Sequence, residues 1–180
     1  GPPPTNPHGC WTYALAWEGI GDGPGLLGKL RSATHFEGWL RRKLGLPTKP
    51  SKDVELHFAN VTIPASPFDD MPALARSLSA LLKECRRLHP QTRRMWCHSW
   101  LNTHPAFLSL FPPEWSRRPI LNPPGNYSSW WGQFKTRTGD FHDERARVFR
   151  ENGGEFPFKG LLCHAEIDAM TAHLAARFNV

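Results

Sequence analysis

A leucine-rich helical pattern between two strand-like segments restricts the fold of this chain more than any other feature. Apolar residues recur at intervals of three and four over residues 70–88, as on one face of an amphipathic helix. The apolar stripe consists of Leu74, Leu78, Leu81, Leu82, Cys85 and Leu88. Asp70 and Pro72 are typical of a helix start, and Pro90 ends the pattern. Such a helix needs an apolar surface to cover, and the flanking segments can supply that surface as strands.

Segments with strand-like patterns lie on both sides of this helix, at residues 54–63 and 94–101. Further strands are expected at residues 12–20, 127–138 and 158–167, and further helices at residues 26–44, 105–111, 141–151 and after Asp168. This order of strands and helices favours an α/β (or α+β) fold. We expect a mixed sheet of about five strands with helices packed mainly on one face.

The length of 180 residues fits a single globular domain, and no internal repeat, linker or low-complexity tract divides the chain. We expect residues 1–9 to form a flexible N-terminal tail. No apolar run approaches the roughly 20 residues that a transmembrane helix needs, and the start lacks the pattern of a secretory signal. These observations predict a cytoplasmic protein without a membrane partner.

The four cysteines are compatible with that compartment. They are widely separated and form no C-x-x-C pair, at Cys10, Cys85, Cys97 and Cys163. A thiolate zinc site usually shows such pairs, and a disulfide framework is not expected in a chain of this length without a secretion signal. We expect buried free thiols and no metal.

Residues 23–28 have the spacing Gly-x-Gly-x-x-Gly between an expected strand and an expected helix, a context in which such turns bind phosphate. Pro24 removes one backbone N–H donor from this turn. Leu30 stands where the phosphate-binding loop pattern needs Ser or Thr. The stretch is interpreted as a turn, and no cofactor is expected.

The net charge of +6 leaves an anionic partner open as an alternative. Basic residues form short groups at residues 41–43, 86–87, 93–94 and 117–118, with no block of five like charges. Two of these groups fall in the last turns of expected helices, where cations offset the helix dipole. A solvated basic surface therefore explains them, and nucleic acid or another anionic ligand is the less favoured interpretation.

Histidines inside three expected strands carry the main functional hypothesis. Side chains alternate along a strand, so residues two apart share a face. One face of the three strands presents Glu55 and His57, then Trp96, His98 and Trp100, and then Leu162, His164 and Glu166. The opposite face is apolar and suits packing under helices. The mixed face predicts a pocket in which imidazoles serve as acid/base groups and indoles hold an apolar substrate.

Loops after the third strand supply the other candidates. The full set of candidate catalytic residues is His57, His98, His104, Glu114, His164 and Glu166. The candidate substrate-binding residues are Trp96, Trp100, Asn102, Tyr127, Trp130 and Trp131. Five prolines at residues 112–124 predict an irregular loop that borders or closes the ligand site.

These patterns favour a small-molecule enzyme that uses non-redox acid/base chemistry, of the isomerase, cyclase or lyase type, on an apolar or aromatic substrate. One alternative is a basic binding module for nucleic acid or another anionic ligand. A second alternative is a non-catalytic interaction protein.

Overall fold

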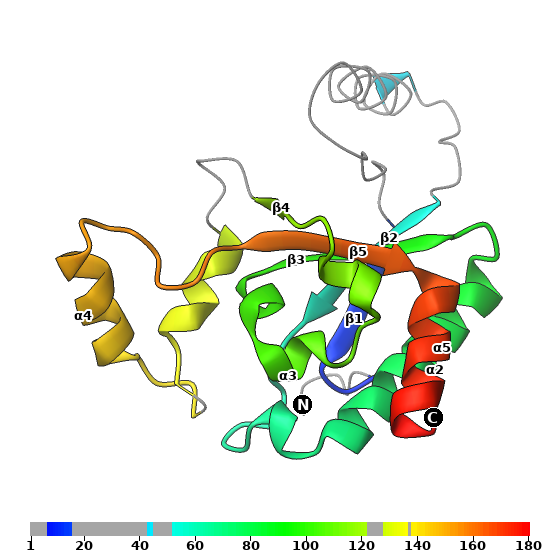
Figure 1. The fold of residues 1–180 in the computed structure, drawn as a ribbon, viewed down its shortest axis with the longest axis horizontal. Coiled ribbons are helices and arrows are strands. Elements are labelled where there is room, and N and C mark those ends of the chain that lie inside the picture. The colour runs from blue at the N-terminus through cyan, green and yellow to red at the C-terminus, as the bar shows by residue number, and fades with distance from the viewer. Residues whose placement is uncertain (1–6, 16–42, 45–51, 122–127, 137) are drawn as a thin grey trace.

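The computed structural model describes residues 7–15, 43–44, 52–121, 128–136 and 138–180 (Figure 1). Most of the expected helix at residues 26–44, the glycine-rich turn at residues 23–28 and Tyr127 lie outside the described residues. The side chain of Trp130 also lies outside them.

A mixed sheet forms the centre of the described structure. Its strands are β1 (Trp11–Leu15), β2 (Asp53–Phe58), β3 (Arg94–Ser99), β4 (Ile120–Leu121) and β5 (Leu161–Glu166), in the spatial order β1-β2-β3-β5-β4. The β2–β3 pair is parallel and the other pairs are antiparallel. The predicted fold class is confirmed, with four full strands and a β4 of only two residues.

Helices cover one face of this sheet, as predicted (Figure 1). The long helix α2 (Met71–Leu88) connects β2 to β3 and packs beside α5 (Ile167–Phe178), and the short α3 (Pro105–Leu108) lies on the same side. The buried strand residues beneath them are Val54, Leu56, Met95, Cys97, Cys163 and Ala165. All four cysteines are free and buried.

Local chemistry fixes the start of α2 where the sequence pattern places it. The Asp70 carboxylate accepts a hydrogen bond from the Ala73 N–H at 2.9 Å, and Ser66 and Asp69 form a capping box just before it. The apolar stripe is buried except for Leu88, which is 47% exposed in the last turn. The Trp11 indole donates to the Leu74 carbonyl at 3.2 Å and thereby joins β1 to this helix.

The strand expected at residues 127–138 is wrong. Residues Ser128–Phe134 form the 3₁₀ helix η4 instead, and Lys135 makes only an isolated bridge to Phe141. Trp131 and Phe134 are three residues apart, so a helical turn brings both rings to one side. There they contact Phe149 and Phe156.

This aromatic cluster is the centre of a small projection that we call the α4 lobe, made of the described residues between 128 and 158. The lobe contains η4 and α4 (Asp143–Glu151), which appears in Figure 1 beyond one end of the sheet. The lobe's aromatic rings are not part of the main hydrophobic core. We call this main core, together with the sheet and the helices that pack on it, the sheet body. A second apolar cluster therefore holds the lobe together.

The residues expected to form an N-terminal tail include His8, which is buried. Its Nε2 lies 3.3 Å from the Glu84 carboxylate on α2. Among the described residues, no helix combines the length and the apolar character that crossing a bilayer requires.

Candidate functional site

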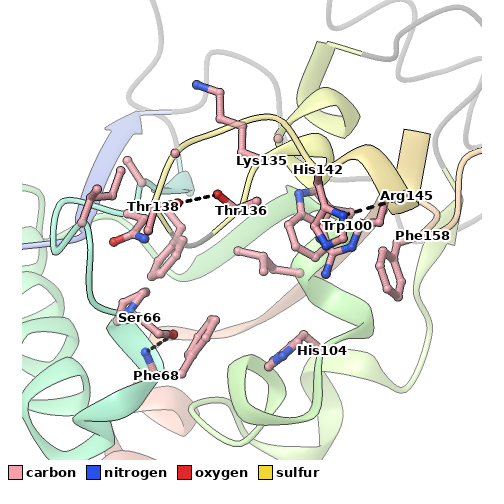
Figure 2. A pocket seen from close by; sticks show the side chains of 18 residues that line it. Ser66, Phe68, Trp100, His104, Lys135, Thr136, Thr138, His142, Arg145 and Phe158 are labelled. Carbon is pink, nitrogen blue, oxygen red and sulfur yellow. Dashed lines mark hydrogen bonds between the residues drawn. The ribbon is translucent and has the colours of Figure 1, made fainter. Parts of the chain in front are cut away.

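A pocket of about 790 Å³ lies where the α4 lobe meets the sheet body (Figure 2). The sheet body contributes the end of β2, the segment that leads into α2, and the 3₁₀ helix η2 (Trp100–Thr103) with His104. The lobe contributes parts of η4, the turn before α4, the first residues of α4 and Phe158. Two segments far apart in the sequence therefore form its opposite sides.

Stacked rings form the wall that belongs to the sheet body. Phe58 and Phe68 stack with centroids 5.9 Å apart, and Phe68 stacks in turn on the His104 imidazole at 4.9 Å. The Nδ1 atom of His104 is buried and has no hydrogen-bond partner among the described residues. A buried polar atom without a partner costs free energy. The imidazole ring itself lines the pocket.

The facing wall is formed by Phe158 and Arg145 of the lobe, which lie against Trp100 of the sheet body. The two rings stack at 5.6 Å, and the Arg145 guanidinium carbon lies 5.7 Å from the Trp100 centroid and 5.2 Å from that of Phe158. These are cation–π distances. Burial lowers the pKa of the Arg145 guanidinium, but arginine remains charged at neutral pH.

Arg145 lacks a carboxylate partner among the described residues. Its Nη1 donates to the Gln133 carbonyl at 2.7 Å, and no Asp or Glu of the described part pairs with it. Arg147, two residues later on the same helix, instead forms ion pairs with Glu144 and Glu151 and faces solvent. A half-buried, unpaired cation that lines a pocket can bind an anion there.

Gln133 holds this wall in place. Its side chain is fully buried, and its amide donates to the Phe158 carbonyl at 3.1 Å and accepts from the Phe158 N–H at 2.9 Å. Its own backbone carbonyl accepts the bond from Arg145. One residue therefore fixes both the aromatic ring and the cation.

His142 begins α4 at the edge of the pocket. Its Nδ1 accepts a hydrogen bond from the Arg145 N–H at 3.3 Å, and its own N–H donates to the Phe134 carbonyl at 2.7 Å. This bond acts as the helix cap, so the Nδ1 atom is acceptor and not donor. The rim above it carries Thr136, Thr138 and the exposed Lys135 (Figure 2).

Of the residues proposed from the sequence, Trp100 and His104 line this pocket. Trp100 does so because β3 ends at Ser99, whose Oγ accepts from the Leu101 N–H at 3.1 Å and starts η2. The indole therefore leaves the sheet face on which strict alternation would place it.

The strand histidines share one sheet face but do not line this pocket. Across the sheet, Glu55 of β2 pairs with Trp96 of β3, and Trp96 pairs with His164 of β5. His57 lies two residues after Glu55, and His98 lies two residues after Trp96, so both share the face of these paired residues. His57 is exposed, and its Nε2 lies 3.9 Å from the Glu55 carboxylate. His98 is partly buried, and this burial lowers the pKa of its imidazole.

Asn102 has a structural role in the described fold. Its side-chain amide donates to the carbonyls of Cys97 at 2.9 Å and Leu161 at 2.7 Å, and its oxygen accepts from the Trp115 indole at 2.9 Å. It joins β3, β5 and the proline-rich segment, and it is buried outside the pocket lining.

The remaining candidates also lie away from the pocket lining. Glu166 is exposed at the start of α5, Glu114 lies in the 3₁₀ helix η3 (Pro113–Ser116), and Trp131 is 55% exposed in the lobe's aromatic cluster. The described part of the proline-rich segment contributes no residue to the pocket and forms η3 and β4. The expectation that it closes over the ligand site is therefore not met at this pocket.

Sequence reasoning missed Arg145, Phe158 and Phe68 as pocket residues, and it missed Gln133 as the buried residue that binds Arg145 and Phe158. A weak signal existed for Arg145, since it precedes Val148 and Phe149 by three and four positions on the apolar side of α4. Arg147 has acidic residues at the same spacings. No local pattern identifies Gln133, because its partners lie 12 and 25 residues away.

Several basic residues of the sequence groups serve the fold. Arg94 forms an ion pair with the buried Asp53 at 2.9 Å, and Arg86 contacts Asp168 on α5. Arg117 and Arg118 are exposed.

No group of three or more His, Cys, Asp and Glu side chains in the described ranges is placed to hold a metal ion. Comparison with protein-family models, with curated proteins and with solved structures found no match to the chain.

Proposed function

We propose that the protein binds a small anionic molecule with a flat apolar body in the pocket between the α4 lobe and the sheet body. The observation that carries the proposal is the Arg145 guanidinium, which lines the pocket, lies against two aromatic rings and lacks a carboxylate partner in the described structure. An anion from a ligand would complete its hydrogen bonding. The Phe68–His104 stack opposite supplies a surface for an aromatic body.

The test is isothermal titration calorimetry with three naphthalene ligands of the same shape. We expect 2-naphthoate or 2-naphthyl phosphate to bind, and the neutral 2-naphthamide to bind at least about tenfold more weakly, because a charge-assisted hydrogen bond contributes roughly 1.5–3 kcal/mol. Replacing Arg145→Gln should weaken binding of the anion by about 10- to 100-fold for the same reason.

Arg147→Gln is the matched control, because it removes the same charge from the same helix outside the pocket. An equal loss of affinity for the anion in both variants would show that only the net charge of the protein matters, and it would contradict the proposal. Failure of both anions to bind the wild-type protein would also contradict it.

A second candidate function, acid/base catalysis in the same pocket, is favoured by His104. Its imidazole lines the pocket, and Nδ1 has no hydrogen-bond partner in the described part of the chain. A histidine that lines a pocket can take a proton from one atom of a bound molecule and return it to another, as in an isomerase, when a ring nitrogen comes within hydrogen-bond distance of that molecule.

The probe for this chemistry is phenylpyruvate, whose enol form becomes the keto form when the hydroxyl loses its proton and a proton is added to the carbon next to the one that bears this oxygen. We expect the protein to accelerate the loss of the enol's ultraviolet absorbance, and His104→Gln to lower the rate by about 10²–10⁴-fold. Binding of 2-naphthoate should weaken far less than the rate falls, because the variant loses one stacking ring but keeps Arg145 and Phe68. An unchanged rate in His104→Gln would exclude this residue as the acid or base.

A further inference from the structure

The charges and donors around the pocket narrow the class of its anionic ligand. We infer that the ligand is a planar monocarboxylate, of the aromatic-acid class, rather than a phosphate ester. This inference rests on the proposed function, because it concerns the group that Arg145 binds.

The positive charge available inside the pocket matches a monoanion. Among the described lining residues, Arg145 and Lys135 carry a permanent positive charge. Lys135 is exposed at the rim, where water weakens its interaction with a ligand, whereas Arg145 is half-buried. A phosphate monoester carries a charge of about −1.5 to −2 at neutral pH, so a single buried guanidinium would leave part of that charge uncompensated.

The backbone at the pocket is also poorly suited to phosphate, which proteins commonly bind at a free helix N-terminus or a nest of N–H groups. The helix that begins at the pocket is α4, and His142 already occupies the Arg145 N–H. Asp143 follows in its first turn, and its negative charge opposes a dianion more strongly than a monoanion. At the start of η1 (Pro67–Asp69), the N–H groups of Phe68 and Ser66 are taken by Ser66 and Asp69 side chains.

The geometry of Arg145 favours a carboxylate. A guanidinium is a planar fork that matches a carboxylate with two parallel hydrogen bonds. The Gln133 carbonyl takes one Nη1 donor and fixes the orientation of the group, which leaves the other donors for a ligand. The stacked pairs Trp100–Phe158 and Phe68–His104 stand on the two sides of the pocket, so that a flat aromatic body contacts rings on both sides.

The experiment compares 2-naphthoate with 2-naphthyl phosphate on the full chain by isothermal titration calorimetry at pH 7.5. We expect the wild-type protein to bind the carboxylate at least about tenfold more tightly. Arg145→Lys keeps the charge and removes the fork, so it should weaken 2-naphthoate by about 10- to 100-fold and bring the two affinities closer together. Arg147→Lys is the matched control and should leave both affinities unchanged.

The outcomes separate the inference from the proposed function. Equal or tighter binding of 2-naphthyl phosphate by the wild-type protein overturns the inference and leaves the anion pocket standing. If Arg145→Lys binds 2-naphthoate as tightly as the wild-type protein does, the two parallel hydrogen bonds from the guanidinium to the carboxylate are not what selects the ligand, and the inference is overturned. Binding of neither ligand overturns both. The wild-type comparison does not depend on any variant, and circular dichroism of Arg145→Lys establishes that its fold is retained.

Discussion

At the scale of single residues, burial decides which groups are reactive. All four cysteines are buried free thiols, and burial raises the pKa of each, that of Cys163 to about 12. Cys97 and Cys163 face each other across the β3–β5 ladder on the covered side of the sheet. Because only the thiolate reacts as a nucleophile, these side chains act as small apolar core residues.

We expect iodoacetamide at pH 8 to label Cys163 of the folded protein about three orders of magnitude more slowly than in the unfolded chain, since a raised pKa leaves less thiolate. Mass spectrometry after timed quenching measures this rate. In denaturant all four cysteines should react quickly. Rapid labelling of Cys163 in the native protein would show that this part of the core opens readily.

At the scale of elements, the sequence predicts correctly those helices and strands that are determined by neighbouring residues, and it fails where contacts between distant residues decide the structure. The period of 3.6 places the leucines of α2 on one side whatever lies beneath them, and the period of two places Cys97 and His98 on opposite faces of β3. Both patterns were therefore predictable. The aromatic residues around Trp131 and Phe134 favour strand by composition, but their contacts with Phe149 and Phe156 select a 3₁₀ helix.

The packing of α2 can be tested within one helix. Leu78 is fully buried, so Leu78→Ala should lower the free energy of unfolding by about 2–5 kcal/mol, measured by urea denaturation. Leu88→Ala removes the same atoms from the same apolar stripe at a position that is 47% exposed, and its effect should be clearly smaller. Similar losses at the two positions would contradict the assigned buried face.

At the scale of the whole molecule, the pocket was the least predictable feature. Its walls come from residues 58–68 and 100–104 of the sheet body and from the lobe, whose Arg145 lies more than 40 positions further along the chain. Trp100 and His104 could be identified because they follow a strand end, where loops carry ligand-binding groups. The facing wall could not, because the bonds of Gln133 and the approach of Phe158 to Trp100 are tertiary contacts without a repeating pattern.

The division of the pocket between two separate apolar clusters has a thermodynamic consequence. The cation belongs to the lobe and the His104 imidazole belongs to the sheet body, so one molecule in contact with both adds a second link between two apolar clusters that already meet at the Trp100–Phe158 stack. Ligand that binds only the folded, docked arrangement adds about 2.7 kcal/mol to its stability at a concentration of 100 times Kd. Ligand binding in the pocket should therefore slow hydrogen exchange of the backbone amides in the lobe, including amides that do not contact the ligand.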